Sequence, residues 1–128
     1  MSRTVLDASA VLAVLKRESG AETVIAAVAE GAAISAVNLA EIVSKLADWG
    51  MDGAAIRGTL DNLDLDVVDF DAELAYAAGL LRPATRAVGL SPGDRACVAL
   101  ARRLGAEALT ADRTWADLKV DVPIRMVR

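Results

Sequence analysis

The chain has 128 residues, a net charge of −4 and no histidine. This length suits one domain, and the hydrophobic fraction of 55%, rich in alanine and with only 3% aromatic residues, favours helices packed closely on a sheet. The acidic balance argues against a module that binds duplex nucleic acid through a basic surface. The lack of histidine excludes Ser-His-Asp and Cys-His catalysis and the zinc sites that need histidine. Carboxylate chemistry remains.

No apolar run approaches the roughly 18 residues of a membrane span. The first run is broken by Asp7 and followed by Lys16, Arg17 and Glu18, which does not fit a signal peptide. We therefore expect a cytoplasmic protein. The single cysteine, Cys97, has no internal disulfide partner and lies on the apolar face of a helical pattern, so it is predicted to be a buried thiol rather than a nucleophile.

Strand and helix patterns alternate along the whole chain. Turn and capping signals separate them, such as Ser91 as N-cap, Pro92 as the first helical residue and Asp94 as the third. Pro83 interrupts a helical pattern and disfavours helix at Arg82. The predicted elements are a strand from Thr4 to Asp7, helices at 8–16 and 21–30, a strand at 32–35, helices at 36–49 and 54–63, a strand at 66–70, helices at 72–81 and 92–104, a strand at 106–110, a helical turn at 115–118 and a strand at 124–127.

This order predicts a single α/β domain over residues 1–128, with a mostly parallel sheet and helices on both faces. Acidic residues crowd the middle of the chain but lack the spacing of a calcium loop, so we interpret them as a solvated rim. They are Asp61, Asp64, Asp66, Asp69 and Asp71.

Four other acidic residues, Asp7, Glu41, Asp94 and Asp112, follow strands or lie in the first turns of helices. Singly, each has an ordinary explanation: Asp7 could cap a helix, Glu41 could pair with Lys45, and Asp94 could close a capping box. These positions, however, face one crevice of an open α/β sheet. Carboxylates gathered there would repel one another unless a cation compensated.

Magnesium is the cation that suits this set, because it prefers oxygen ligands and shares its shell with water and phosphate. Held by carboxylates, it lowers the pKa of a bound water and neutralises charge on a phosphoryl oxygen. Phosphoryl chemistry at a magnesium ion is therefore the reaction that this sequence predicts.

Four segments closely resemble the motifs of the PIN-domain VapC toxins. They are Val5-Leu6-Asp7-Ala8-Ser9, Ser35-Ala36-Val37-Asn38-Leu39-Ala40-Glu41, Gly89-Leu90-Ser91-Pro92-Gly93-Asp94-Arg95-Ala96-Cys97 and Leu109-Thr110-Ala111-Asp112-Arg113-Thr114-Trp115. The resemblance spans almost the whole chain, and one departure is Pro92, where that family commonly has an aliphatic residue. Because Pro92 falls at a helix position that tolerates proline, we expect only a small effect on the preceding loop.

The resemblance implies a PIN fold and a Mg²⁺- or Mn²⁺-dependent endoribonuclease that cuts structured RNA of the tRNA or rRNA class. It implies that Asp7, Glu41, Asp94 and Asp112 are the catalytic, metal-binding acids, supported by Ser9, Asn38 and Thr110. It also implies a VapB-type antitoxin as partner. We expect that antitoxin to lie along the apolar helices between Ala21 and Gly53, with a basic side chain in the acidic site, and we expect homodimerisation through another helical face.

Two alternatives remain at this stage. A receiver-like regulatory domain also binds magnesium, but it uses paired acids after its first strand and a lysine after a late strand; here Asp7-Ala8-Ser9 follows the first strand and no lysine follows Thr110. A catalytically silent PIN-like binding module is the other. Six arginines are candidates for contacts with RNA phosphates, namely Arg82, Arg86, Arg95, Arg102, Arg103 and Arg113.

Overall fold

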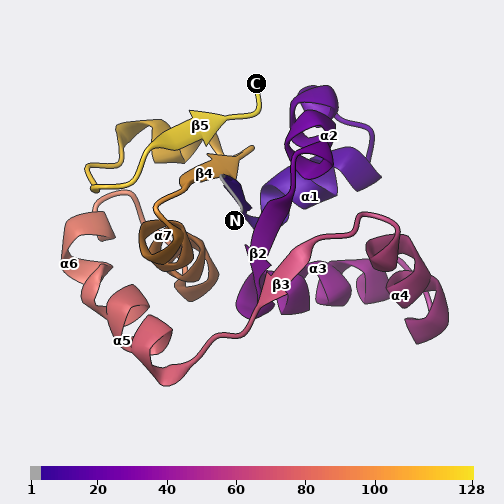
Figure 1. Ribbon diagram of the computed structural model, residues 1–128, viewed down its shortest axis with the longest axis horizontal. Coiled ribbons are helices and arrows are strands. Elements are labelled where there is room, and N and C mark those ends of the chain that lie inside the picture. Colours follow the sequence, from indigo (N-terminus) through magenta and orange to yellow (C-terminus); the bar gives the residue numbers. More distant parts are fainter. Residues whose placement is uncertain (1–3) are drawn as a thin grey trace.

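Five parallel strands form the centre of the computed structural model, which describes residues 4–128 (Figure 1). Their order in the sheet is β3-β2-β1-β4-β5, and each strand runs parallel to its neighbours. The strands are β1 (Thr4–Leu6), β2 (Ala32–Ser35), β3 (Asp66–Val68), β4 (Glu107–Thr110) and β5 (Ile124–Met126). The predicted parallel α/β sheet is therefore confirmed.

Helices cover both faces of this sheet, as predicted, with α1 to α4 on one side and α5 to α7 on the other (Figure 1). The first group comprises α1 (Ala8–Leu15), α2 (Ala21–Ala29), α3 (Ala36–Asp48) and α4 (Gly53–Asp61). The second comprises α5 (Ala72–Leu80), the short α6 (Arg82–Thr85) and α7 (Pro92–Leu104), and a 3-10 helix, η1 (Arg113–Asp117), follows β4.

Alternate residues of the central strands enter two separate cores. Val5 and Ala108 pack with α5, α7 and the fully buried Trp115, whereas Leu6 and Leu109 pack with α1 to α4. Successive side chains of a strand point to opposite faces, so a strand covered by helices on both sides is apolar throughout. This explains the continuous apolar run of β1, which ends only at Asp7.

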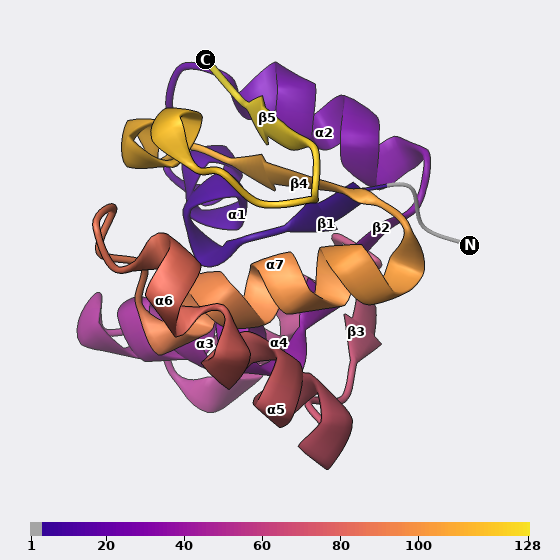
Figure 2. The same cartoon turned by 90° about the vertical axis from the view of Figure 1, so that its left-hand side faces the viewer.

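The order of the strands decides where a ligand would bind. The chain moves from β1 to β2 and β3 in one direction and then returns to β4 on the other side of β1. In open α/β sheets, ligands bind outside the carboxyl ends of the strands at such a reversal. The end of β1, the start of α7 and η1 all lie on one side of the molecule, at the left in Figure 2.

This order also excludes the receiver-like alternative, because receiver domains have the flavodoxin-like order 2-1-3-4-5. The parallel sheet here has the order 3-2-1-4-5 instead. The two topologies place different strands at the reversal, so they cannot build the same site.

Two details of the predicted elements are corrected by the structure. Arg82 is helical, contrary to the prediction, because α5 ends at Leu80 and Pro83 falls in the first turn of α6, where its missing N–H costs nothing. The strand predicted at 66–70 ends at Val68. Over residues 4–128, no helix is long and apolar enough to cross a membrane.

Candidate active site

Asp7 lies directly after β1 and is buried, with only 2% of its surface exposed. One of its oxygens, Oδ1, accepts hydrogen bonds from the backbone N–H of Ala10 at 2.8 Å and from the hydroxyl of Ser9 at 2.7 Å. Thr110 Oγ1 donates to the other, Oδ2. Asp7 is thus the N-cap of α1, but its second oxygen is held from across the sheet, which a simple cap does not need.

Burial raises the pKa of Asp7 to about 6, since the charged form loses its hydration. The hydrogen bonds from Thr110, Ala10 and Ser9 act in the opposite direction and lower this pKa. The negative charge of Asp94 raises it, as the smallest of these causes. Repulsion among the acids, the cause expected from the sequence, is therefore present but secondary to burial.

Thr110 connects Asp7 with Asp112. Its hydroxyl, buried at the end of β4, donates to Asp7 and accepts from the backbone N–H of Asp112 at 3.0 Å. Asp112 in turn caps η1, and its Oδ1 accepts from the backbone N–H and the hydroxyl of Thr114 at 3.0 and 2.7 Å. The hydroxyl of Thr110 thereby joins the residues that follow β1 and β4, Asp7 and Asp112.

Asp94 occupies the third position of α7, as predicted. The backbone N–H of Ser91 donates to Asp94 Oδ2 at 3.0 Å, and the backbone N–H of Asp94 donates to the Ser91 hydroxyl at 3.1 Å. This is a reciprocal capping box, with Pro92 in the first turn, so the unusual proline is compatible with the helix start. The capping box holds the half-buried carboxylate at the positive end of the helix dipole.

Glu41 is fixed by Asn38 rather than by Lys45. The Nδ2 atom of the buried Asn38 donates to Glu41 Oε1 at 2.8 Å and to the backbone carbonyl of Gly93 at 3.0 Å. The Oδ1 atom of Asn38 is buried without a hydrogen-bond partner among the described residues. An unpaired buried acceptor costs about 1–3 kcal/mol, which indicates that the position of this amide serves the site more than the stability of the fold.

Cys97 lies one turn along α7 from Asp94 and is buried. Burial raises the pKa of the Cys97 thiol, and the charges of Asp7, Asp94 and Glu41 raise it further. Cys97 is therefore a buried thiol, as predicted. Asp112 is linked to Asp7 through Thr110. Each predicted support thus contacts one of the acids: Ser9 and Thr110 donate to Asp7, and Asn38 donates to Glu41.

Three of the four acids share one arrangement, in which one carboxylate oxygen is anchored and the other is left open, whereas both oxygens of Asp7 accept hydrogen bonds. Glu41 Oε1, Asp94 Oδ2 and Asp112 Oδ1 accept the bonds described above, and no hydrogen bond within residues 4–128 is recorded for their second oxygens. In this part of the chain no three acidic or cysteine side chains are close enough to hold an ion together. Magnesium, however, commonly takes only one or two protein carboxylates and completes its shell with water and phosphate. The donor set therefore fits this ion.

The candidate arginines fall into three groups. Arg82, Arg86 and Arg113 are exposed: Arg82 belongs to α6, Arg86 follows it, and Arg113 belongs to η1. Arg95 instead turns toward α5, where its Nη1 donates to the carbonyl of Ala78 at 3.3 Å. Arg102 and Arg103 form ion pairs with Asp121 and Asp71.

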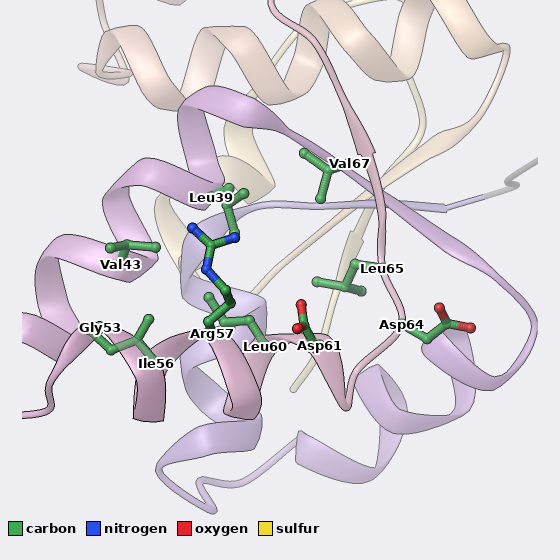
Figure 3. Close-up of a pocket in the computed structure, with 10 residues that line it drawn as sticks. All are labelled: Leu39, Val43, Gly53, Ile56, Arg57, Leu60, Asp61, Asp64, Leu65 and Val67. Atoms are coloured by element: carbon green, nitrogen blue, oxygen red, sulfur yellow. The ribbon is translucent and has the colours of Figure 1, made fainter.

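A separate cavity of about 330 Å³ lies between α3, α4 and β3 (Figure 3). Leu39, Val43, Ile56 and Leu60 give it an apolar lining, and the side chain of Arg57 extends among them toward Leu39. The acidic residues Asp61 and Asp64 of the predicted rim also border it, and all five rim aspartates are exposed, as expected. None of the four site acids lines this cavity.

Sequence reasoning did not identify the parts that Gly93 and Thr114 play in the site. Thr114 follows Asp112 by two residues, and at this spacing an aspartate side chain often accepts a hydrogen bond from the backbone N–H. The contact with Thr114 could therefore have been predicted from the sequence. Gly93 gave no comparable signal, because its importance depends on which side chain of α3 lies against it.

The sequence matches the model of the PIN domain family over residues 4–120. The chain belongs to this family, whose members are generally nucleases that use divalent metals. The resemblance predicted from the four motifs is thus confirmed for the PIN family. No curated protein matches the chain by sequence.

Solved structures share the fold at low identity. VapBC2 from Rickettsia felis, bound to a DNA fragment from its promoter, is 20% identical with a TM-score of 0.73, over 96% of this chain and 97% of that chain. DNA-bound VapBC from Salmonella typhimurium is 18% identical with a TM-score of 0.70, over 100% of both chains. VapBC-5 from Mycobacterium tuberculosis, from the VapBC family of toxin–antitoxin systems, is 18% identical with a TM-score of 0.61, over 100% and 99%.

Proposed function

We propose that this PIN domain is the toxin of a type II toxin–antitoxin pair and acts as a Mg²⁺- or Mn²⁺-dependent endoribonuclease on structured RNA of the tRNA or rRNA class. The observation that carries the proposal is the buried Asp7 at the β1–β4 reversal, with Asp94 and Glu41 close by. A fold has little reason to keep such a group of anchored carboxylates except to bind a cation.

Asp7, Glu41, Asp94 and Asp112 would hold the metal through their open or displaceable oxygens. When bound, the ion would lower the pKa of an attacking water and offset charge on the phosphoryl group. Thr110 and Ser9 hold the Asp7 carboxylate in one orientation. Because the chain has no histidine, activation of the water would depend on this charge and on the carboxylates of the site.

RNA binding is assigned to the exposed arginines of α6 and η1. Arg82, Arg86 and Arg113 lie on the side of the molecule where α7 begins, and their charges would offset the repulsion between an acidic protein and phosphate. Arg95 remains a weaker candidate, since its guanidinium contacts α5.

We further propose a VapB-type antitoxin as the partner, in a hetero-oligomer. The VapBC structures named above support this, as does the apolar cavity between α3 and α4 (Figure 3). Val43, on the expected helices, is 37% exposed and lines that cavity, and Ile25 of α2 is 54% exposed. An antitoxin segment there would cover apolar surface, and its arginine could bridge two carboxylates of the site.

Homodimerisation is a third part of the proposal. Tyr76 and Leu80 are 72% and 78% exposed, and both belong to α5, which lies on the other side of the sheet from α1 to α4 (Figure 1). A second copy covering them would leave the α3–α4 cavity free for the antitoxin. Sedimentation of the isolated protein over a range of concentrations would detect the dimer.

The nuclease is tested by incubating purified protein with labelled tRNA and rRNA fragments, with Mg²⁺ or Mn²⁺ and then with EDTA. Asp7→Asn and Asp94→Asn should abolish cleavage while the proteins remain folded. Asp52→Asn is the matched control, because Asp52 also caps a helix through its carboxylate but lies at the start of α4. Near-normal cleavage by either site variant at saturating metal would overturn the assignment. Binding of RNA without any cleavage would instead favour the silent PIN-like module.

The partner is tested by coexpression with the small open reading frame beside the gene, followed by size exclusion. Coelution and inhibited cleavage are expected. Separate elution, with cleavage unchanged by the small protein, would remove the antitoxin from the proposal without affecting the nuclease.

A further inference from the structure

Gly93, the second residue of α7, is buried against the carboxylate of Glu41. A Cβ placed on Gly93 would lie 2.2 Å from Glu41 Oε1, 2.7 Å from Cδ and 2.9 Å from Oε2. Real Cβ atoms do not make contacts this short. The backbone of Gly93 does not need a glycine, since its φ is not in the left-handed region, so the reason for a glycine is space.

The atoms in conflict are the far end of one flexible side chain. All three close contacts of the added Cβ are with the Glu41 carboxylate, and none is with backbone. Glu41 is also exposed, so its side chain can move into solvent. An alanine at 93 should therefore leave α7 and the fold intact while displacing this carboxylate.

Asn38 holds the Glu41 carboxylate in its present position. Its Nδ2 atom donates to Glu41 Oε1 and to the Gly93 carbonyl, and both partners can only accept. If the Asn38 amide were rotated by half a turn, its Oδ1 atom would lie against the two acceptors, Glu41 Oε1 and the Gly93 carbonyl. Glu41, Asn38 and Gly93 therefore form one contact between α3 and α7, which we call the Glu41 seat.

We propose that Gly93 is a positioning residue, whose missing side chain lets the Glu41 carboxylate lie against the first turn of α7, beside Asp94. The effect of Gly93 on metal binding rests on the proposed function. The effect of Gly93 on the position of Glu41 does not, because it depends only on the Glu41 seat.

The chain offers a direct spectroscopic test, because it contains two asparagines, Asn38 and Asn62, and no glutamine. A ¹⁵N-labelled sample therefore has only two side-chain amide pairs. In Gly93→Ala, the Asn38 pair should move to the position that it has in Glu41→Ala, where the carboxylate is absent, and the exposed Asn62 pair should stay in place. In the Glu41→Ala background, adding Gly93→Ala should cause little further change.

Gly58→Ala is the matched control. Gly58 lies inside α4, and an added Cβ there meets no atom within 4 Å. Its replacement should leave both amide pairs unmoved. The double variant Glu41→Ala/Gly93→Ala guards against misfolding, since it removes the clash and should fold even if Gly93→Ala alone does not.

The second readout is Mn²⁺ affinity of the purified protein by calorimetry. Gly93→Ala should weaken it by about 10-fold or more, the range seen when a partner that orients a metal ligand is lost. In Glu41→Ala the added Gly93→Ala should have no such effect. An Asn38 amide pair that stays at its wild-type position in Gly93→Ala would overturn the proposal. A moved amide pair with no Mn²⁺ binding by the wild type would keep the Glu41 seat and refute the proposed metal site.

Discussion

Replacing Asp7 by Asn should change how the stability of the metal-free protein depends on pH. Burial raises the pKa of Asp7 from 3.8 to about 6, so the folded protein takes up this proton before the unfolded chain does. Its contribution to stability is thus greatest below pH 3.8 and is lost as the pH rises through 6. Asparagine does not titrate, so the variant lacks this dependence.

The size of the effect follows from the two pKa values. Above pH 6 the buried charge costs about 3 kcal/mol, at roughly 1.4 kcal/mol for each unit of pKa shift. Between pH 7.5 and pH 5, Asp7 becomes mostly protonated in the folded state and stays ionised in the unfolded state. The wild type should therefore gain about 1.4 kcal/mol over Asp7→Asn in this interval.

Urea unfolding at the two pH values, with EDTA present, measures this difference. Because each variant is compared with the wild type, the pH dependence contributed by all other titratable groups cancels. Asp71→Asn is the control: a hydrogen bond from Arg103 lowers the pKa of Asp71 to about 2, so Asp71 is ionised at both pH values and its gap to the wild type should not change. If the gap between Asp7→Asn and the wild type were also the same at pH 7.5 and pH 5, Asp7 would not carry a raised pKa and the reasoning would fail.

Three further predictions concern the same region. Thr110→Val should lower the free energy of unfolding at pH 7.5 by about 1–3 kcal/mol in urea, because it leaves an oxygen of the buried Asp7 without its donor; unchanged stability would contradict this. Calorimetry should show weaker Mg²⁺ binding at pH 5.5 than at pH 8, because the cation must displace the proton of Asp7, and equal affinities would count against this site. Arg95→Ala should lower the melting temperature, because it removes the contact with α5. Arg82→Glu should leave the melting temperature unchanged but weaken both RNA binding and the dependence of that binding on salt. The reverse pattern would show that Arg95 binds RNA and that Arg82 stabilises the fold.

Local interactions are what the sequence predicted best. The capping box between Ser91 and Asp94 spans three residues, and its residue types decide it wherever the helix lies. Asp7 was placed at the end of the first strand because a carboxylate stops an apolar run. The alternation of strands and helices likewise predicted a parallel sheet covered on both faces, since few other arrangements bury such strands.

The four acids were predicted as a group, and for a physical reason as well as by resemblance. Each follows a strand or begins a helix, and in a parallel sheet those positions share one edge. That prediction needed no information about side-chain packing. The raised pKa of Asp7 could not be predicted in this way. Its largest cause is burial, which depends on how β1, β4 and α1 pack around the carboxylate.

Contacts between residues far apart in the chain were decided only by the tertiary structure. Thr110 reaches Asp7 across 103 residues, and Asn38 reaches Gly93 across 55. In both cases the residue types permit many partners, and the choice depends on how closely two elements approach. The sequence alone could not show that Gly93 is small for the sake of Glu41, or that Arg95 turns to α5, because these follow from the distances at which α7 packs against α3 and α5.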